Sequence, residues 1–199
     1  NQFSLRVKQV SNALLNLGLK PQEHIAVFAQ NCLQYLYTDM GAYGVRAVTI
    51  PFYATSSDQQ IQFVVNDAQV RFIFVGEQEQ YDKAHRVLNL CSSLERIVVF
   101  DRNVRISSHD PNTLYFDDFL KLGENLPRQS EVEKLWSEAK EDDLCNILYT
   151  SGTTGDSKGV MITYSQYHAA LVSNAMCVPV NDSDRVISFL PFTHIFERA

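Results

Sequence analysis

The residues best suited to chemistry form one short segment, residues 150–159, with the sequence TSGTTGDSKG. Its three glycines let the backbone turn sharply and approach a ligand closely. Runs of exposed backbone N–H groups in such turns bind anions. The Ser and Thr hydroxyls add donors for phosphate oxygens, and Lys158 adds a positive charge. The segment is therefore interpreted as a loop that wraps a polyphosphate.

Three other readings of this segment are possible from its composition. Gly/Ser/Thr runs also form flexible linkers, but this run directly joins the apolar residues 144–149 to the apolar residues 160–163. A Walker A loop needs Gly-Lys-Ser/Thr, whereas the order here is Ser-Lys-Gly. The glycine spacing also differs from the Gly-x-Gly-x-x-Gly pattern of dinucleotide-binding proteins. Phosphate binding by another type of loop is the favoured interpretation.

The elements that would position this loop alternate along the chain. Apolar runs without polar alternation predict buried strands at residues 24–29, 47–50, 71–75, 96–100 and 144–149. Apolar residues at helical spacing predict helices near residues 3–17, 33–40, 57–68, 81–91, 117–123 and 131–139. This alternation predicts an α/β fold, with a mainly parallel sheet flanked by helices.

Several finer features follow from local signals. Asn31 is expected to cap the second helix, Pro51 to close the second strand, and Ser57 with Gln60 to form a capping box. Ser130 with Glu133 is a further candidate capping box.

The later part of the chain carries weaker signals. Residues 140–143 are read as a solvated turn, and residues 186–190 as a strand that ends just before His194. The polar segment 101–143 suggests a boundary. We expect residues 1–140 to form an N-terminal α/β subdomain, and residues 141–199 to begin the next subdomain with the loop.

Composition limits the class of protein. The chain has 199 residues, is 45% hydrophobic and 20% charged, and carries a net charge of −6, which argues against nucleic-acid binding. No apolar run is long enough to span a membrane. The four cysteines include no Cys-x-x-Cys pair and are read as buried reduced thiols in a cytoplasmic protein. Because the chain starts without Met inside a predicted helix, we expect it to be part of a longer protein.

Two motifs make the sequence recognisable. Residues 149–160 (YTSGTTGDSKGV) closely resemble the phosphate-loop signature of the adenylate-forming superfamily. This superfamily contains acyl-CoA synthetases, luciferases and the adenylation domains of nonribosomal peptide synthetases. Residues 189–198 (FLPFTHIFER) resemble its Leu-Pro-x-x-His block, and the extension to Phe-Glu-Arg is similar to long-chain fatty acyl-CoA synthetases. The chain departs from the family at Ser157, where Pro is usual, and at Tyr164, where many members have His.

The resemblance implies an ATP-dependent fatty acid:CoA ligase that forms an acyl-adenylate and then an acyl-CoA thioester. Lys158 and His194 would be the catalytic residues, and Thr150 would help to hold Mg²⁺. ATP, Mg²⁺ and CoA would be the cofactor and co-substrates. The phosphates would be bound by Thr150, Ser151, Gly152, Thr153, Thr154, Gly155, Lys158 and Gly159.

Two alternatives stay open. One is an adenylation domain that activates another carboxylic or amino acid, and the other is a non-catalytic phosphate-binding module. The expected partners are small molecules (fatty acid, ATP and CoA), with peripheral membrane contact open and the oligomeric state undetermined. The family's adenine-binding motif, ribose-binding Asp and C-terminal catalytic Lys would lie beyond residue 199, so the 199 residues alone are expected to be inactive.

Overall fold

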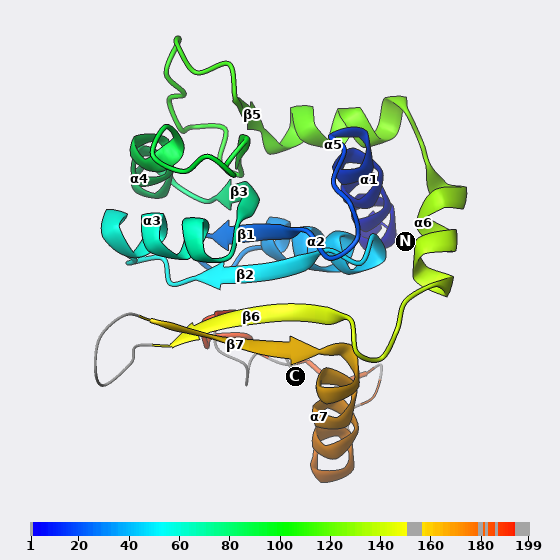
Figure 1. Ribbon diagram of the computed structural model, residues 1–199. Helices are drawn as coiled ribbons and strands as arrows, with labels where there is room; N and C mark the ends of the chain where they lie inside the picture. The colour runs from blue at the N-terminus through cyan, green and yellow to red at the C-terminus, as the bar shows by residue number, and fades with distance from the viewer. Residues whose placement is uncertain (1, 151–156, 179–180, 182, 186, 194–199) are drawn as a thin grey trace.

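A computed structural model describes residues 2–150, 157–178, 181, 183–185 and 187–193. The centre of the fold is a seven-stranded sheet in the order β5-β4-β3-β1-β2-β6-β7 (Figure 1). The strands are β1 (His24–Phe28), β2 (Val48–Phe52), β3 (Val70–Val75), β4 (Arg96–Val99), β5 (Thr113–Tyr115), β6 (Leu144–Thr150) and β7 (Lys158–Thr163). All neighbouring strands are parallel except β6 and β7, which are antiparallel. The predicted α/β fold with a mainly parallel sheet is confirmed.

Helices cover both faces of the parallel part of the sheet. They are α1 (Gln2–Asn16), α2 (Leu33–Gly44), α3 (Asp58–Asp67), α4 (Gln78–Leu88), α5 (Phe116–Asn125), α6 (Gln129–Ser137) and α7 (Tyr164–Cys177). One apolar cluster joins the sheet to α3 and α4, and the other joins it to α1, α2 and α5. Within the described residues, no helix has the length and hydropathy that crossing a bilayer requires.

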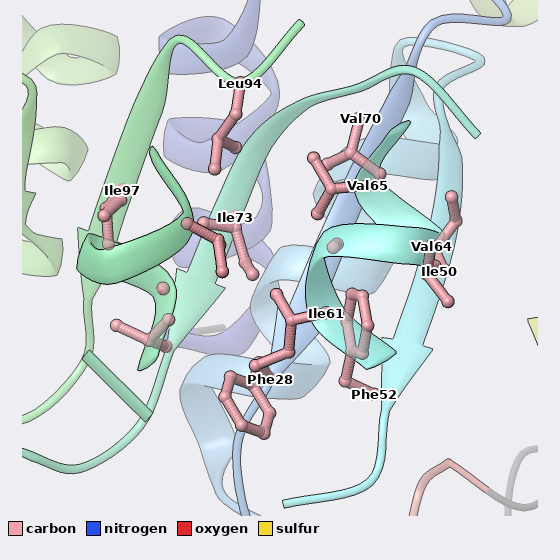
Figure 2. Packing of buried hydrophobic residues seen from close by; sticks show 14 of the residues in the cluster. Phe28, Ile50, Phe52, Ile61, Val64, Val65, Val70, Ile73, Leu94 and Ile97 are labelled. Atoms are coloured by element: carbon pink, nitrogen blue, oxygen red, sulfur yellow. The ribbon is translucent and has the colours of Figure 1, made fainter. Parts of the chain in front are cut away.

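The central strand β1 shows why the strands read as continuous apolar runs. Ile25 and Val27 point into the cluster with α1 and α2, whereas Ala26 and Phe28 point into the cluster with α3 and α4. Successive side chains of a strand alternate between faces, so a strand covered on both faces must be apolar throughout. Figure 2 shows Ile61 of α3 packed over Phe28 and its neighbours in the cluster with α3 and α4.

Two predictions about the first strands and helices are wrong. The N-cap of α2 is Cys32, without a side-chain hydrogen bond, because the Asn31 amide is engaged by residues far along the chain. Pro51 does not close β2 but lies inside it, opposite Val27, and the register continues to Phe52. The fixed φ of proline is compatible with extended backbone. The predicted capping box of Ser57 and Gln60 is confirmed.

The segment between β4 and β6 also differs from prediction. It contains a short strand, β5, that sequence patterns did not indicate. The capping box of Ser130 and Glu133 is wrong, because α6 begins at Gln129 with Arg128 as its N-cap. Tertiary contacts hold that start instead: Arg128 donates its backbone N–H to Asn12 and a guanidinium N–H to the backbone of α1.

The cysteines and the last described segment require two further corrections. None of the four cysteines forms a disulfide, and Cys91 and Cys145 are buried, but Cys32 is half-buried and Cys177 is exposed on α7. Residues 187–190 do not form the predicted strand. They pair with none of the described strands, so Ile187 and Phe189 are 82% and 77% exposed.

Candidate functional site

The predicted phosphate loop closes a β-hairpin. β6 and β7 are antiparallel, and Thr150 at the end of β6 is the register partner of Lys158 at the start of β7. Side chains of directly opposite residues lie on the same face of a sheet, about 5 Å apart at Cβ. The hairpin therefore places the side chains of Thr150 and Lys158 next to each other on one face of the sheet. Sequence analysis identified both residues, but it did not predict their pairing.

The middle of the loop and the second motif from His194 onward are not covered by this geometry. Ser151, Gly152, Thr153, Thr154 and Gly155 lie outside the described residues, as does His194. Their assignment to phosphate binding and catalysis stays a prediction.

Burial differs sharply between the two strands of the hairpin. Cys145, Asn146 and Ile147 of β6 are buried, whereas Val160 and Met161 of β7 are 49% and 63% exposed. The apolar stretch that follows the loop is thus partly exposed, unlike the buried strand that precedes it. β7 lies at the edge of the sheet, so one of its sides has no neighbouring strand among the described residues.

Gly159 is required by packing. A Cβ atom built at this position would lie 2.8 Å from Cγ2 of Ile147 and 3.1 Å from Cζ of Tyr149. Tyr149 is the register partner of Gly159, so its ring lies across the space that a side chain would occupy. The sequence interpretation assigned Gly159 to the phosphate loop, and the structure adds this second reason for a glycine there.

Tyr149 ties the carboxyl end of β6 to α3. Its hydroxyl donates a hydrogen bond to Asp67, the last residue of α3, and its ring packs edge-on against Phe63 at 6.4 Å between centroids. Burial raises the pKa of Tyr149 well above its ordinary value, and the neighbouring carboxylate of Asp67 raises it further. The phenol is therefore neutral and acts as a donor at physiological pH.

A cavity of about 460 Å³ opens between the carboxyl ends of β2 and β6. Ligands of open α/β sheets bind at this edge, and pockets of about 300–1,000 Å³ hold small molecules. Both described ends of the loop, Thr150 and Ser157, line the cavity. Its other walls are Pro51, Phe52, Tyr53, Ser56, Gln60, Val64 and Tyr149.

Sequence reasoning missed the β2 side of this cavity. Phe52 and Tyr53 follow Pro51, and the prediction that Pro51 closes the strand placed them in a connecting loop. In the structure β2 runs to Phe52, and Ser57 caps α3 directly beyond it. The useful signal was the capping box at residues 57–60, which predicts a helix N-terminus at the same edge of the sheet.

Tyr164 lies at the opposite end of the hairpin from the loop. It follows Thr163, which pairs with Leu144 at the base of the hairpin, and its hydroxyl donates to the backbone carbonyl of Tyr43. Burial raises the pKa of Tyr164, so it is neutral as well. Its ring packs edge-on against Tyr43 and its backbone N–H donates to Asp143, so these contacts lie at the base of the hairpin, away from the loop.

The described residues near the loop supply only part of the oxygen ligands that a metal ion such as Mg²⁺ requires. Thr150 offers one hydroxyl oxygen, and hydroxyl oxygens are compatible with Mg²⁺, which also takes carboxylate, phosphate and water ligands. Among the described residues, no group of three His, Cys, Asp or Glu side chains could hold a metal ion. The remaining ligands would therefore come from phosphates, water or other parts of the protein.

Comparison with known proteins gives consistent matches over the chain. A family model described as AMP-binding enzyme matches residues 1–199. Fatty acyl-CoA synthetase A of Dictyostelium discoideum is 32% identical over 209 residues, covering 100% of this chain and 29% of that protein. The human long-chain-fatty-acid–CoA ligase ACSBG2 is 28% identical, covering 98% of this chain and 29% of its own length. The chain thus spans under one third of these relatives.

Solved structures share the fold. The crystal structure of a putative long-chain-fatty-acid CoA ligase from Rhodopseudomonas palustris superposes with a TM-score of 0.79 at 18% identity, covering 98% of this chain and 45% of that one. A fatty acyl CoA synthetase of Mycobacterium tuberculosis gives a TM-score of 0.75 at 19% identity, covering 99% of this chain and 35% of that one. With the family model matched from end to end, the chain belongs to the family of AMP-binding enzymes, and long-chain fatty acyl-CoA synthetases are among its relatives.

Proposed function

We propose that this chain is the part of an ATP-dependent fatty acid:CoA ligase that binds the phosphates of ATP. One observation carries the proposal: the hairpin pairs Thr150 with Lys158 beside the cavity at the carboxyl ends of β2 and β6. The family match and the 32% identity to a fatty acyl-CoA synthetase support the substrate class.

The proposed reaction has two steps. In the first, a carboxylate oxygen of the fatty acid attacks the α-phosphorus of ATP, the bond to the bridging oxygen of the β-phosphate breaks, and pyrophosphate leaves. In the second, the thiolate sulfur of CoA attacks the acyl carbonyl carbon and AMP leaves. Negative charge builds up on pyrophosphate in the first step, so catalysis there depends on positioning and charge neutralisation.

Each proposed residue has a role in the first step. Lys158 would neutralise charge on the leaving pyrophosphate. The Thr150 hydroxyl would contribute one oxygen ligand to Mg²⁺, which would supply further positive charge at the phosphates. The loop residues 151–155 would donate to the β- and γ-phosphates. His194 would donate a hydrogen bond to the acyl carboxylate or the α-phosphate, both of which carry charge during adenylation.

We also propose that residues 141–199 begin a second α/β subdomain after residues 1–140. The turn before β6 supports this division, since Lys140, Glu141 and Asp142 are exposed there. Limited proteolysis of the full-length protein should cleave at this turn before it cleaves within β1–β4. We further expect the enzyme to act in the cytoplasm, and peripheral contact with a membrane stays open.

ATP–pyrophosphate exchange by the full-length protein tests the proposed function. Exchange with palmitate but not with acetate, benzoate or amino acids, followed by palmitoyl-CoA formation when CoA is added, is the expected result. Exchange with an amino acid and no acyl-CoA product would instead identify an adenylation domain of another class. The 199-residue chain alone should form no acyl-CoA. In the full-length protein, Lys158→Ala is the matched control that tests whether exchange depends on the loop.

A further inference from the structure

Asn31 holds a distant segment of the chain by its side-chain amide. It follows β1 at the carboxyl edge of the sheet, and its Nδ2 donates to the backbone carbonyl of Leu190 at 2.6 Å. Its Oδ1 accepts from the backbone N–H of Phe192 at 2.9 Å. A carboxamide carries the same donor and acceptor pair as a peptide group. Asn31 therefore binds the backbone on both sides of Pro191, as a neighbouring strand would.

A second contact holds the same segment. The ring of Phe192 packs edge-on against Tyr35 of α2, with 5.3 Å between ring centroids. Tyr35 is fully buried and Phe192 is 8% exposed, and both belong to the apolar cluster with α1 and α2. Phe189, only three residues earlier, is 77% exposed. Among the described residues after α7, the segment is thus attached to the core at Leu190–Phe192.

This attachment lies at the same edge of the sheet as the phosphate loop. β1, β2 and β6 are parallel neighbours, so their carboxyl ends lie along one edge. Asn31 follows β1 at that edge, and the loop follows β6. His194 is two residues after Phe192 in the sequence.

We propose that Asn31 is a positioning residue. By holding the backbone at Leu190 and Phe192, it fixes this segment, which precedes His194 in the sequence, at the edge of the sheet where β6 ends. The effect of Asn31 on catalysis rests on the proposed function, whereas its attachment of the segment does not. The helix-capping role predicted for Asn31 leaves these two hydrogen bonds unexplained, and Cys32 occupies the N-cap position.

Hydrogen exchange in the full-length protein tests the attachment directly. In Asn31→Ala, the amide of Phe192 should exchange about tenfold faster than in wild type, because it loses its acceptor. Asn31→Asp keeps an acceptor for Phe192 but loses the donor to Leu190, so protection at Phe192 should be largely retained. Gln30→Ala, on the exposed neighbour in the same loop, is the matched control and should exchange as wild type. Unchanged exchange at Phe192 in Asn31→Ala would overturn the proposal.

Kinetics of the same variants test the positioning role. Asn31→Ala should raise the KM for the fatty acid and lower the adenylation rate about tenfold, while the Kd for a nonhydrolysable ATP analogue stays within twofold. A wild-type enzyme that exchanges no pyrophosphate with any fatty acid would refute the proposed function but would leave the hydrogen-exchange test of Asn31 standing. Faster exchange throughout β1–β4 together with a lowered Tm, or equal losses in acid and ATP affinity, would show a merely structural residue and refute the positioning role.

Discussion

The carboxylate of Asp143 forms an ion pair with the guanidinium of Arg46, 97 residues earlier in the chain. Both Nε and Nη2 of Arg46 lie 2.8 Å from Oδ2 of Asp143, and the two side chains are 13% and 10% exposed. The same carboxylate oxygen accepts the backbone N–H of Lys140. The turn at residues 140–143, predicted to be solvated, is therefore anchored at its last residue to the turn before β2. This ion pair holds the base of the hairpin that carries the predicted phosphate loop.

Asp143→Ala should lower the free energy of unfolding by about 2–3 kcal/mol, because it leaves the half-buried Arg46 without its partner. Urea unfolding followed by circular dichroism measures the change. Asp142→Ala alters an exposed carboxylate on the same turn and should stay within about 0.5 kcal/mol of wild type. Equal effects of the two substitutions would contradict a specific role for the ion pair.

Gly159→Ala should destabilise the hairpin by about 1–3 kcal/mol, since the added Cβ overlaps Ile147 and the ring of Tyr149. The lowered Tm should be accompanied by faster hydrogen exchange along β7. Val160→Ala changes the adjacent, half-exposed position without adding an atom near Tyr149, so it serves as the control. A Gly159→Ala protein with wild-type Tm and wild-type exchange would show that the hairpin tolerates a side chain there.

The free energy of unfolding should fall with rising pH above about 10, the ordinary pKa of tyrosine. Burial raises the pKa of Tyr149 and Tyr164 in the folded chain. Above the unfolded pKa, the unfolded chain releases these protons while the folded chain keeps them, so stability is present below pH 10 and is lost as pH rises toward the folded pKa values. Tyr149→Phe should cost about 1 kcal/mol at pH 7 through the lost hydrogen bond to Asp67 and should flatten the alkaline loss.

Urea unfolding between pH 7 and pH 11 measures this dependence. Tyr53→Phe is the control, because it makes the same chemical change at a side chain that is 49% exposed. An alkaline loss of stability in Tyr149→Phe as steep as in wild type would assign the effect to other groups.

Lys158→Ala in the full-length enzyme should raise the activation free energy of adenylation by ~2–4 kcal/mol, by analogy with the loss of one preorganised charge-stabilising donor. Transfer of the acyl group from preformed acyl-adenylate to CoA should change much less. Pyrophosphate exchange and single-turnover transfer separate the two steps. Lys140→Ala removes an exposed lysine from the turn before β6 and should leave both steps unchanged. Equal losses in both half-reactions would make Lys158 a structural residue.

Much of the parallel core could be predicted because its signals are local. A strand buried on both faces needs an unbroken apolar run, as in residues 72–75 of β3, and an amphipathic helix needs apolar residues at helical spacing, as in α3. The capping box of Ser57 with Gln60 involves residues three apart and was predicted correctly. Residues 187–190 show the limit of this reasoning: an apolar run becomes a strand only where a neighbouring strand supplies hydrogen bonds.

For the site, the amino-acid sequence by itself determined which residue types the loop offers, and Gly, Ser, Thr and Lys at this spacing predict phosphate binding. The tertiary structure decided the rest: the pairing of Thr150 with Lys158, the packing of Tyr149 over Gly159, and the engagement of Asn31 with Phe192. The physical reason is the length of chain that separates the partners. Asn31 has the local signature of a helix cap, and only a fold that brings a segment 161 residues away to the end of β1 gives its amide two backbone partners instead.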